Sequence, residues 1–281
     1  GSTCAMLVAV YSQSGYRTGV YTSPHLVHFE ERCRIGGAPV AAADLVPAMA
    51  EVEQARLGRG DEAEVSLTYF EFTTLAILLT LSRQPLDVVV LEVGLGGRLD
   101  ATNIVTPLAS VITPVQFDHE RWLGNTLAAI ATEKAGIIKP RVPVIVGPQD
   151  DDALRVIEAR AMGLSAPIVA HGQHWMIQPE RDGMVFQDDH GLWDLPRPNL
   201  IGPHQIQNAG AALMALRHLG KDEAACEAAV TRAEWPARMQ RLRRGPLVDL
   251  APDVELWLDG GHNPDAGAAI AKTLEVRCHG S

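Results

Sequence analysis

Residues 88–103 read VVVLEVGLGGRLDATN, a short apolar run that ends at Glu92 and continues into a glycine-rich loop. The run from Val88 to Leu91 is apolar without alternation, which is typical of a strand covered by helices on both faces. We therefore expect this strand to lie in the middle of a parallel sheet. The glycines that follow allow a ligand or a metal to approach the backbone closely, although many loops of this kind are only tight turns.

Similar short runs of β-branched residues recur along the chain and alternate with helical patterns. This alternation indicates an α/β fold with a mostly parallel sheet flanked by helices. Thr68 and Glu71 have the spacing of a capping box, so a helix should begin there. The other expected strands cover residues 19–21, 110–113, 144–146 and 168–170, and two expected helices cover residues 42–57 and 70–81.

The second half of the chain predicts an antiparallel meander on the sheet's edge over residues 174–195, followed by helices over residues 206–216 and 223–232. Trp235-Pro236 is the best candidate linker, because proline ends a helix. We expect one domain over residues 1–236 and the start of a second over residues 237–281. Strands at 247–250 and 256–259 with one helix at 264–276 are too little to bury a core, so the second domain should be incomplete.

Composition excludes several classes of protein. The 281 residues are 47% hydrophobic and 21% charged, with a formal net charge of −10, which disfavours binding to nucleic acid. No apolar run approaches the roughly 20 residues that span a membrane. The four cysteines show no Cys-x-x-Cys spacing, so we expect ordinary free thiols and a cytoplasmic location. We also expect a monomer.

Polar residues at the carboxyl ends of strands mark the expected ligand crevice of an open parallel sheet. Glu92 ends one apolar run, and Asp118-His119 follows the run at 110–113. An imidazole beside a carboxylate could join Glu92 on a divalent cation, but His119 could equally be a solvated loop residue. Asp259 opens a third segment, residues 259–264, which is either a site or a strand-to-helix turn.

Lys134 falls on the inward face of a helix that Asn125-Thr126 opens. Leu127, Ile130 and Ala131 occupy the same stripe at helical spacing. Desolvation lowers the pKa of a lysine and makes its amine nucleophilic, so Lys134 could bind a phosphate or react with carbon dioxide to give a carbamate. The alternative is a lysine that extends its amine to the surface.

Together these segments resemble the folylpolyglutamate synthase and dihydrofolate synthase family, within the Mur-type ligases. The resemblance covers nearly the whole chain. It rests on Gly1-Ser2-Thr3, Asp118-His119 and the stretches 21–26, 67–71, 91–103, 133–137, 204–209, 235–238 and 259–264.

The resemblance implies a Mur ligase central domain with a P-loop-type sheet and an incomplete Rossmann-like C-terminal domain. It implies ATP and Mg²⁺, with two magnesium ions possible. Ser23, Glu92 and His119 match its magnesium ligands, and Lys134 matches a lysine that is carbamylated in relatives. The implied catalytic residues are Lys134, His119, Arg238 and His262; the nucleotide contacts are Gly1, Ser2, Thr3, Asn208, Arg238, Asp259 and His262; and the substrate contacts are Thr68, Phe70 and Asp100.

The implied activity is ATP-dependent ligation of L-glutamate to dihydropteroate, to the γ-carboxyl of reduced folates, or to both. The family's phosphate loop reads Gly-Thr-Asn-Gly-Lys-Gly, and this sequence starts at its last glycine. We therefore expect a piece of a longer protein that is inactive as given. The alternatives are a Mur-type cell-wall ligase and a non-catalytic nucleotide-binding protein, which the missing lysine favours.

Overall fold

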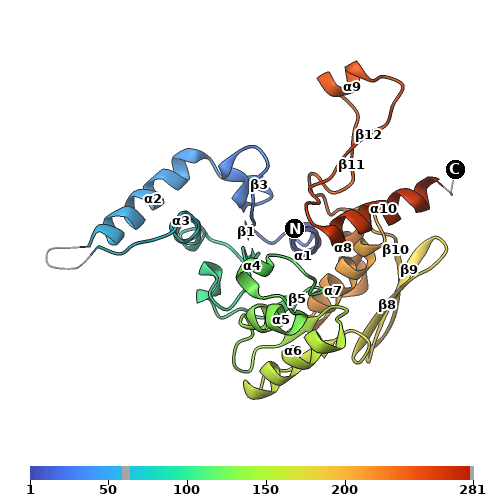
Figure 1. The fold of residues 1–281 in the computed structure, drawn as a ribbon, viewed down its shortest axis with the longest axis horizontal. Helices are drawn as coiled ribbons and strands as arrows, with labels where there is room; N and C mark the ends of the chain where they lie inside the picture. The colour runs from blue at the N-terminus through green and yellow to red at the C-terminus, as the bar shows by residue number, and fades with distance from the viewer. Residues whose placement is uncertain (59–63, 279–281) are drawn as a thin grey trace.

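The computed structural model describes residues 1–58 and 64–278, and these form a mixed α/β fold in which helices flank two short sheets (Figure 1). The predicted α/β class is confirmed. The longer helices are α1 (Ser2–Gln13), α2 (Ala42–Leu57), α3 (Tyr69–Ser82), α5 (Leu127–Ala135), α6 (Asp151–Gly163), α7 (His204–His218), α8 (Glu223–Thr231) and α10 (Pro264–Cys278), and the short ones are η1 (Phe29–Arg32), η2 (Ala101–Ile104), α4 (Glu120–Leu123) and α9 (Pro246–Leu250).

The first sheet has the order β3-β2-β1-β4. Strand β1 (Thr18–Tyr21) runs parallel to β4 (Val88–Leu91), while β2 (Cys33–Ile35) and β3 (Ala38–Pro39) extend the sheet in antiparallel fashion. The expectation that β4 lies mid-sheet is wrong, because β4 is the edge strand among the described residues. Its apolar run reflects packing on its two faces, where Val88 and Leu91 contact different core clusters, and says nothing about lateral pairing.

The second sheet is wholly parallel, as predicted. It has the order β5-β6-β7, formed by Ser110–Ile112, Val144–Val146 and Ile168–Ala170. Helices α5 and α6 cover it, and Ile130, Val144 and Ile157 are fully buried between these elements.

A third sheet is the predicted meander, formed by β8 (Trp175–Pro179), β9 (Gly183–Asp188) and β10 (Gly191–Pro196). It is a separate sheet of order β10-β9-β8, not an extension of the parallel sheet. Trp175 and Phe186 stack with ring centroids 6.1 Å apart and join a core shared with α1, α7 and α8. This core fixes the starts of α1 and α7 relative to each other.

The chain after residue 236 forms the hairpin β11 (Gln240–Leu242) and β12 (Leu256–Leu258), with α9 between its strands, and ends in α10. Figure 1 shows α9 projecting from the rest of the molecule. The predicted strand at 247–250 is wrong, because Gly245 and Pro246 start a short exposed helix there. The division into domains at residue 236 stays a prediction.

Among the described residues, no helix is both long enough and apolar enough to span a membrane. Cys4, Cys33 and Cys226 are free thiols, as predicted, and the last two are buried. Burial raises the pKa of the Cys33 and Cys226 thiols to about 12, so neither is reactive at neutral pH.

Candidate functional site

The carboxyl ends of β1 and β4 bring Ser23 and Glu92 together. Tyr21 lies opposite Leu91 in the parallel ladder, and the Glu92 backbone amide donates to the Tyr21 carbonyl at 2.9 Å. The Ser23 amide donates to Glu92 Oε2 at 3.3 Å. The Gly1 nitrogen lies against Glu92 Oε1, so α1 begins beside this carboxylate.

The start of α1 also lies beside α7. Thr3 Oγ1 donates to Asn208 Oδ1 at 3.5 Å, and the Asn208 amide donates to Gln205 Oε1 at 3.0 Å. Ser2 and Thr3 are both buried. The free backbone amides at the start of a helix favour an anion such as a phosphate, so the structure brings three predicted nucleotide contacts, Ser2, Thr3 and Asn208, to a suitable place.

Asp100 organises the glycine-rich loop. Its Oδ2 accepts from the amides of Gly94 (3.1 Å) and Leu95 (2.9 Å), and its Oδ1 accepts from the amide and hydroxyl of Thr102 at 2.9 and 2.6 Å. The buried carboxylate thus stabilises the loop itself. Its predicted contact with substrate stays a prediction.

The other two predicted substrate residues, Thr68 and Phe70, lie at the start of α3. Thr68 is exposed and forms the predicted capping box with Glu71, whose amide donates to Thr68 Oγ1 at 3.2 Å. The Phe70 ring lies against Gly94, where an added Cβ would stand 2.2 Å from the ring. The predicted cap is therefore confirmed and Phe70 packs against the glycine-rich loop, while contact of either residue with substrate is untested.

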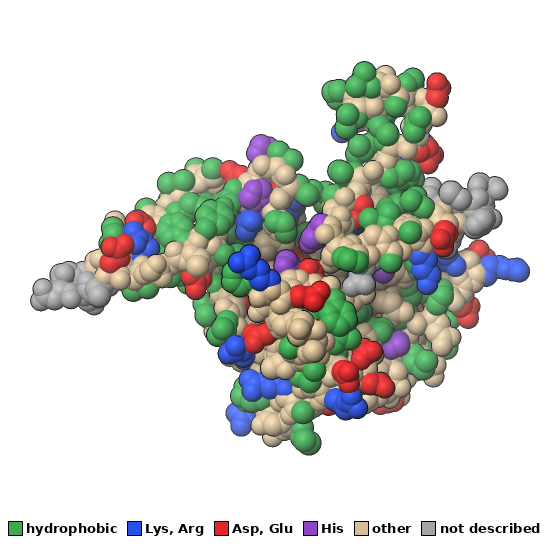
Figure 2. Space-filling model, viewed as in Figure 1, with side chains coloured by type: hydrophobic (Ala, Val, Ile, Leu, Met, Phe, Trp, Pro, Cys, Tyr) green, Lys and Arg blue, Asp and Glu red, His purple; other side chains and the backbone are tan. Residues whose placement is uncertain are grey.

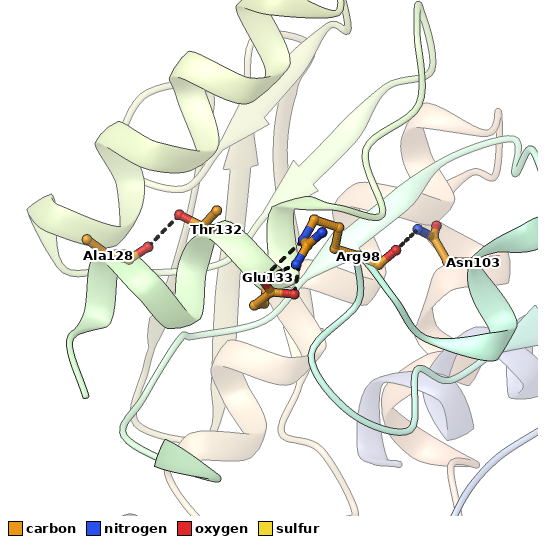
Figure 3. Close-up of polar contacts among 5 residues, drawn as sticks. All are labelled: Arg98, Asn103, Ala128, Thr132 and Glu133. Carbon is orange, nitrogen blue, oxygen red and sulfur yellow. Dashed lines mark hydrogen bonds and ion pairs between the residues drawn. The ribbon is translucent and has the colours of Figure 1, made fainter. Parts of the chain in front are cut away.

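An ion pair fastens the glycine-rich loop to α5 (Figure 3). Arg98 donates from Nε and Nη2 to the Glu133 carboxylate, with the shortest contact at 2.9 Å, and its backbone amide donates to the Glu133 carbonyl at 2.8 Å. The Asn103 side chain donates to the carbonyls of Arg98 and Gly136. Gly136 permits this approach, because a Cβ there would lie 2.3 Å from the Arg98 side chain.

Lys134 follows Glu133 and is half-buried at the inner end of α5, as its helical position predicts. Burial lowers the pKa of its ammonium group from 10.5, and the nearby Asp118 carboxylate partly opposes that shift. The Lys134 side chain makes no hydrogen bond or ion pair within the described part of the chain. A desolvated amine without a partner is more nucleophilic than a solvated lysine, as its position in the sequence predicts.

Asp118 and His119 meet the segment before α10. The Asn263 side chain donates to Asp118 Oδ2 at 2.9 Å. Asp118, His119 and His262 each place one metal-binding atom within 4.8 Å of the others. Glu92 is not part of this compact group, so the structure divides the predicted magnesium ligands: Ser23 lies with Glu92, and His119 lies with Asp118 and His262.

Asp259 shapes the same C-terminal segment. Its carboxylate accepts from the amides of Met239 and Gly261, each at 2.7 Å. The Arg238 guanidinium lies against Gly260, where a Cβ would stand 2.8 Å from Nη1. Burial lowers the pKa of His204 at the start of α7, with Asp259 opposing and Arg238 reinforcing the shift, so these two residues face α7.

Figure 2 shows the surface hollowed between the arm of α2 and α3 and the arm that carries α9, with histidine side chains along the hollow. The elements that position the predicted residues thus converge on one region of the molecule.

Comparison with known proteins yields close relatives over almost the whole chain, although no family model matches. Dihydrofolate synthase/folylpolyglutamate synthase of Escherichia coli is 38% identical over 279 residues, which are 98% of this chain and 61% of the relative. Folylpolyglutamate synthase of Lacticaseibacillus casei is 33% identical over 98% of this chain and 65% of its own length. The solved structure of E. coli FolC in complex with DHPP and ADP superposes with a TM-score of 0.86 at 37% identity, covering 98% of this chain and 63% of FolC.

Over nearly its whole length the chain is similar to members of the dihydrofolate synthase/folylpolyglutamate synthase family. It spans less than two thirds of the length of the E. coli and L. casei members. The predicted resemblance is therefore confirmed, as is the Mur ligase type of fold. A further family structure, with 36% identity and a TM-score of 0.84, holds Mn, AMPPNP and L-glutamate.

The residues around β1 and β4 fit a magnesium ion by their chemistry. Mg²⁺ prefers oxygen ligands; Glu92 supplies a carboxylate, and Ser23, whose backbone amide donates to that carboxylate, carries a hydroxyl. His119 offers nitrogen from a neighbouring loop. The family assignment leaves the individual role of each residue untested.

Sequence reasoning missed several contacts that shape the site. Asn263 and Asp118 connect the two halves of the region, and His204 has a buried Nδ1 without a hydrogen-bond partner. Asp118 itself was predicted as the carboxylate beside His119, but its contact with Asn263 was not. No sequence signal predicted the pairing of Arg98 with Glu133. It depends on the close approach of Gly136 to Arg98 and of Gly97 to the Glu133 carbonyl, between segments that are separate in the sequence.

Proposed function

We propose that the protein containing this chain is an ATP-dependent ligase that joins L-glutamate to dihydropteroate, to the γ-carboxyl of reduced folates, or to both. The observation that carries the proposal is the placement of α1's start, Glu92 and Asn208 next to one another in a family whose members are named for this chemistry. Family structures holding ADP with DHPP, and AMPPNP with Mn and L-glutamate, support the same substrates.

The chemistry requires activation of a carboxylate, because attack by an amine would otherwise have to expel oxide. A carboxylate oxygen attacks the γ-phosphorus of ATP, which releases ADP and gives an acyl phosphate. The glutamate amine then adds to the acyl carbon, and the tetrahedral adduct expels phosphate and loses a proton to give the amide. Water must be excluded, since it would hydrolyse the acyl phosphate.

The nucleotide is assigned to the start of α1 and to the segments that face it. The amides of Gly1, Ser2 and Thr3 would bind phosphate oxygens, and Asn208 would contact the base or sugar. The C-terminal segment would close over the nucleotide with the remaining contacts, Arg238, Asp259 and His262.

Ser23, Glu92 and His119 would hold Mg²⁺, which neutralises phosphate charge when bound. The single Ser23–Glu92 hydrogen bond supports the first two members of this set. Thr68, Phe70 and Asp100 would border the pterin-containing substrate, in addition to their observed cap, packing and loop contacts.

Lys134 is proposed to carry a carbamate. Its lowered pKa increases the neutral amine, whose nitrogen forms a bond to the carbon of CO₂ and releases a proton. The product is an anion placed beside Asp118 and His119, suited to a second cation. Incubation with ¹³C-bicarbonate should give a carbamate carbon resonance that the Lys134→Met variant lacks; the same resonance in the variant would remove this assignment.

The deciding assay is glutamate-dependent ADP release by the protein that contains this chain, with dihydropteroate and tetrahydrofolate offered separately. Turnover with either substrate supports the proposal and shows which acyl donor is used. Turnover with a UDP-muramyl substrate instead would establish a cell-wall ligase. ATP binding without substrate-dependent release would favour a non-catalytic nucleotide-binding protein. A monomeric state and a cytoplasmic location are part of the proposal and rest on its small substrates and free thiols.

A further inference from the structure

Three side chains from distant parts of the sequence form a compact cluster of metal-binding atoms. Asp118 and His119 lie in the loop between β5 and α4, and His262 lies in the loop before α10. One ligand atom from each residue lies within 4.8 Å of the other two. The cluster therefore spans two segments that the chain connects only through more than half of its length.

The ligand types favour a transition metal over magnesium. Mg²⁺ binds almost entirely through oxygen, whereas Zn²⁺ commonly takes two imidazoles and one carboxylate, with water as the fourth ligand. We propose that Asp118, His119 and His262 form a binding site for a zinc-type divalent ion that joins the β5–α4 loop to the loop before α10.

The structure already orients His262 for this role. Its Nδ1 lies 3.0 Å from the carbonyl oxygen of Gly260. A carbonyl only accepts hydrogen bonds, so Nδ1 must carry the proton and the neutral ring presents Nε2 with a free lone pair. A backbone carbonyl in this position is the usual outer partner of a metal-binding histidine.

Asp118 is oriented from both sides. Its Oδ1 accepts from the backbone amide of His119 at 2.8 Å, and its Oδ2 accepts from the side chain of Asn263 at 2.9 Å. Each carboxylate oxygen keeps a further lone pair. The Asn263 contact also holds the two loops together without a metal. Less conformational entropy is therefore lost when a metal brings the ligands together.

His119 is held in a rare backbone conformation. Its φ is +52°, a left-handed value that costs a non-glycine residue about 1 kcal/mol. The amides of Trp122 and Leu123 donate to its carbonyl at 2.8 and 3.0 Å, which fixes the residue at the start of α4. Strain of this kind is concentrated at functional positions.

The remaining adjustment is small. Ligands of tetrahedral Zn²⁺ lie roughly 3.4 Å apart, and no pair in the cluster is more than 4.8 Å apart, so the widest pair must approach by at most about 1.4 Å. His119 and His262 are both exposed, so side-chain rotation is enough and no core residue has to move.

One consequence rests on the proposed function. His119 is also assigned to the magnesium set, so a zinc-type ion bound by the cluster would withdraw it from that set and inhibit ligation. The binding itself does not depend on this, because it can be measured without nucleotide, Mg²⁺ or substrate.

The test is titration of Zn²⁺ by calorimetry, and of Co²⁺ by visible absorption, into chelator-treated protein that contains this chain and lacks a histidine tag. One ion per chain should bind, with the intense absorption of low-coordinate Co²⁺. His262→Gln and Asp118→Asn should each weaken binding by at least about tenfold. The matched control is His190→Gln, an exposed histidine beside Asp188 outside the cluster, which should bind as the unaltered protein does.

Circular dichroism checks that each variant is folded. Hydrogen exchange tests whether the ion joins the β5–α4 loop to the loop before α10. Zn²⁺ should slow amide exchange at residues 259–263 in the unaltered protein and not in His262→Gln. Absence of binding at micromolar Zn²⁺, or equal binding by His262→Gln and the unaltered protein, would overturn the proposal. Zn²⁺ binding by a protein that shows no ligase activity when assayed free of zinc with Mg²⁺ would instead count against the proposed function alone.

Discussion

The Asn263 side chain donates a hydrogen bond to Asp118 Oδ2 at 2.9 Å, across 145 positions of sequence. The same Asn263 accepts through Oδ1 from the amide of Ala266 at 2.8 Å and so caps α10. One side chain thus both starts the last helix and attaches it to the loop that carries His119. This attachment also positions His262, because His262 is the residue before Asn263.

Replacing Asn263 by alanine should loosen this attachment. The change removes two hydrogen bonds, one of them a helix cap, which together are worth about 2 kcal/mol. Hydrogen exchange measured by mass spectrometry should therefore accelerate over residues 259–268. Asn125→Ala is the control, since Asn125 is exposed, and exchange in that segment should not change. Equal protection in both variants would show that the Asp118 contact contributes nothing.

Replacing Glu133 by glutamine should weaken the fastening of the glycine-rich loop. The ion pair is half-exposed on the Arg98 side, with 51% of that side chain accessible, so we expect a loss of about 1 kcal/mol or less in unfolding free energy. Ligation should fall more than stability does, because the loop follows Glu92. Thr132→Ala, which removes a hydroxyl one position away that donates to Ala128, is the control and should retain activity. Full activity in Glu133→Gln would mean that the loop is held by its backbone contacts alone.

Replacing Gly136 by alanine should be severe. The new Cβ would lie 2.4 Å from the Arg98 Cα and 2.8 Å from its nitrogen, and backbone atoms cannot rotate away. We expect a loss of roughly 3 kcal/mol in urea unfolding. Gly163→Ala is the matched control at the end of α6: nothing lies within 4 Å of its added Cβ, so we expect a stabilisation of up to about 1 kcal/mol. Similar effects of the two changes would show that the close approach is not present in solution.

Replacing Lys134 by methionine should raise stability at pH 7. Burial lowers the pKa of Lys134 in the folded protein, so the unfolded chain binds this proton more tightly, and its charge destabilises the fold below the folded pKa. As pH rises from that value toward 10.5 the penalty disappears, and the two proteins should converge. Urea unfolding in bicarbonate-free buffer measures this, with the exposed Lys272→Met as control. A constant difference across this pH range would contradict the assigned burial.

Local patterns in the sequence predicted the parts of the fold that local physics determines. Helix α3 followed from its capping box, and the inward position of Lys134 followed from helical spacing with Ile130 and Ala131. The order of strands is not local information, which is why β4 was expected mid-sheet. The short helix Pro246–Leu250 was not predicted, because a four-residue stretch with three apolar side chains, Leu247 to Leu250, fits a strand or a helix equally well.

The sequence motifs predicted which residues belong to the candidate site, but only part of how these residues are arranged in space. The sequence identified Glu92, His119, Asp259 and His262 as residues at the ends of strands or in strand-to-helix turns. It did not reveal that His119 would be grouped with His262 more closely than with Glu92, because that depends on how the segment after residue 236 folds back. The long-range Asn263–Asp118 contact is the physical cause.

The central claim is that Ser23, Glu92, His119 and Lys134 serve one cation-assisted nucleotide site. The most direct measurement is anomalous scattering from Mn²⁺ in crystals of the protein that contains this chain, grown with AMPPNP. The account predicts manganese bound by Glu92 and Ser23 at the start of α1, with His119 and a modified Lys134 facing the phosphates. Manganese and nucleotide located away from Glu92, with Lys134 unmodified and turned to solvent, would contradict it.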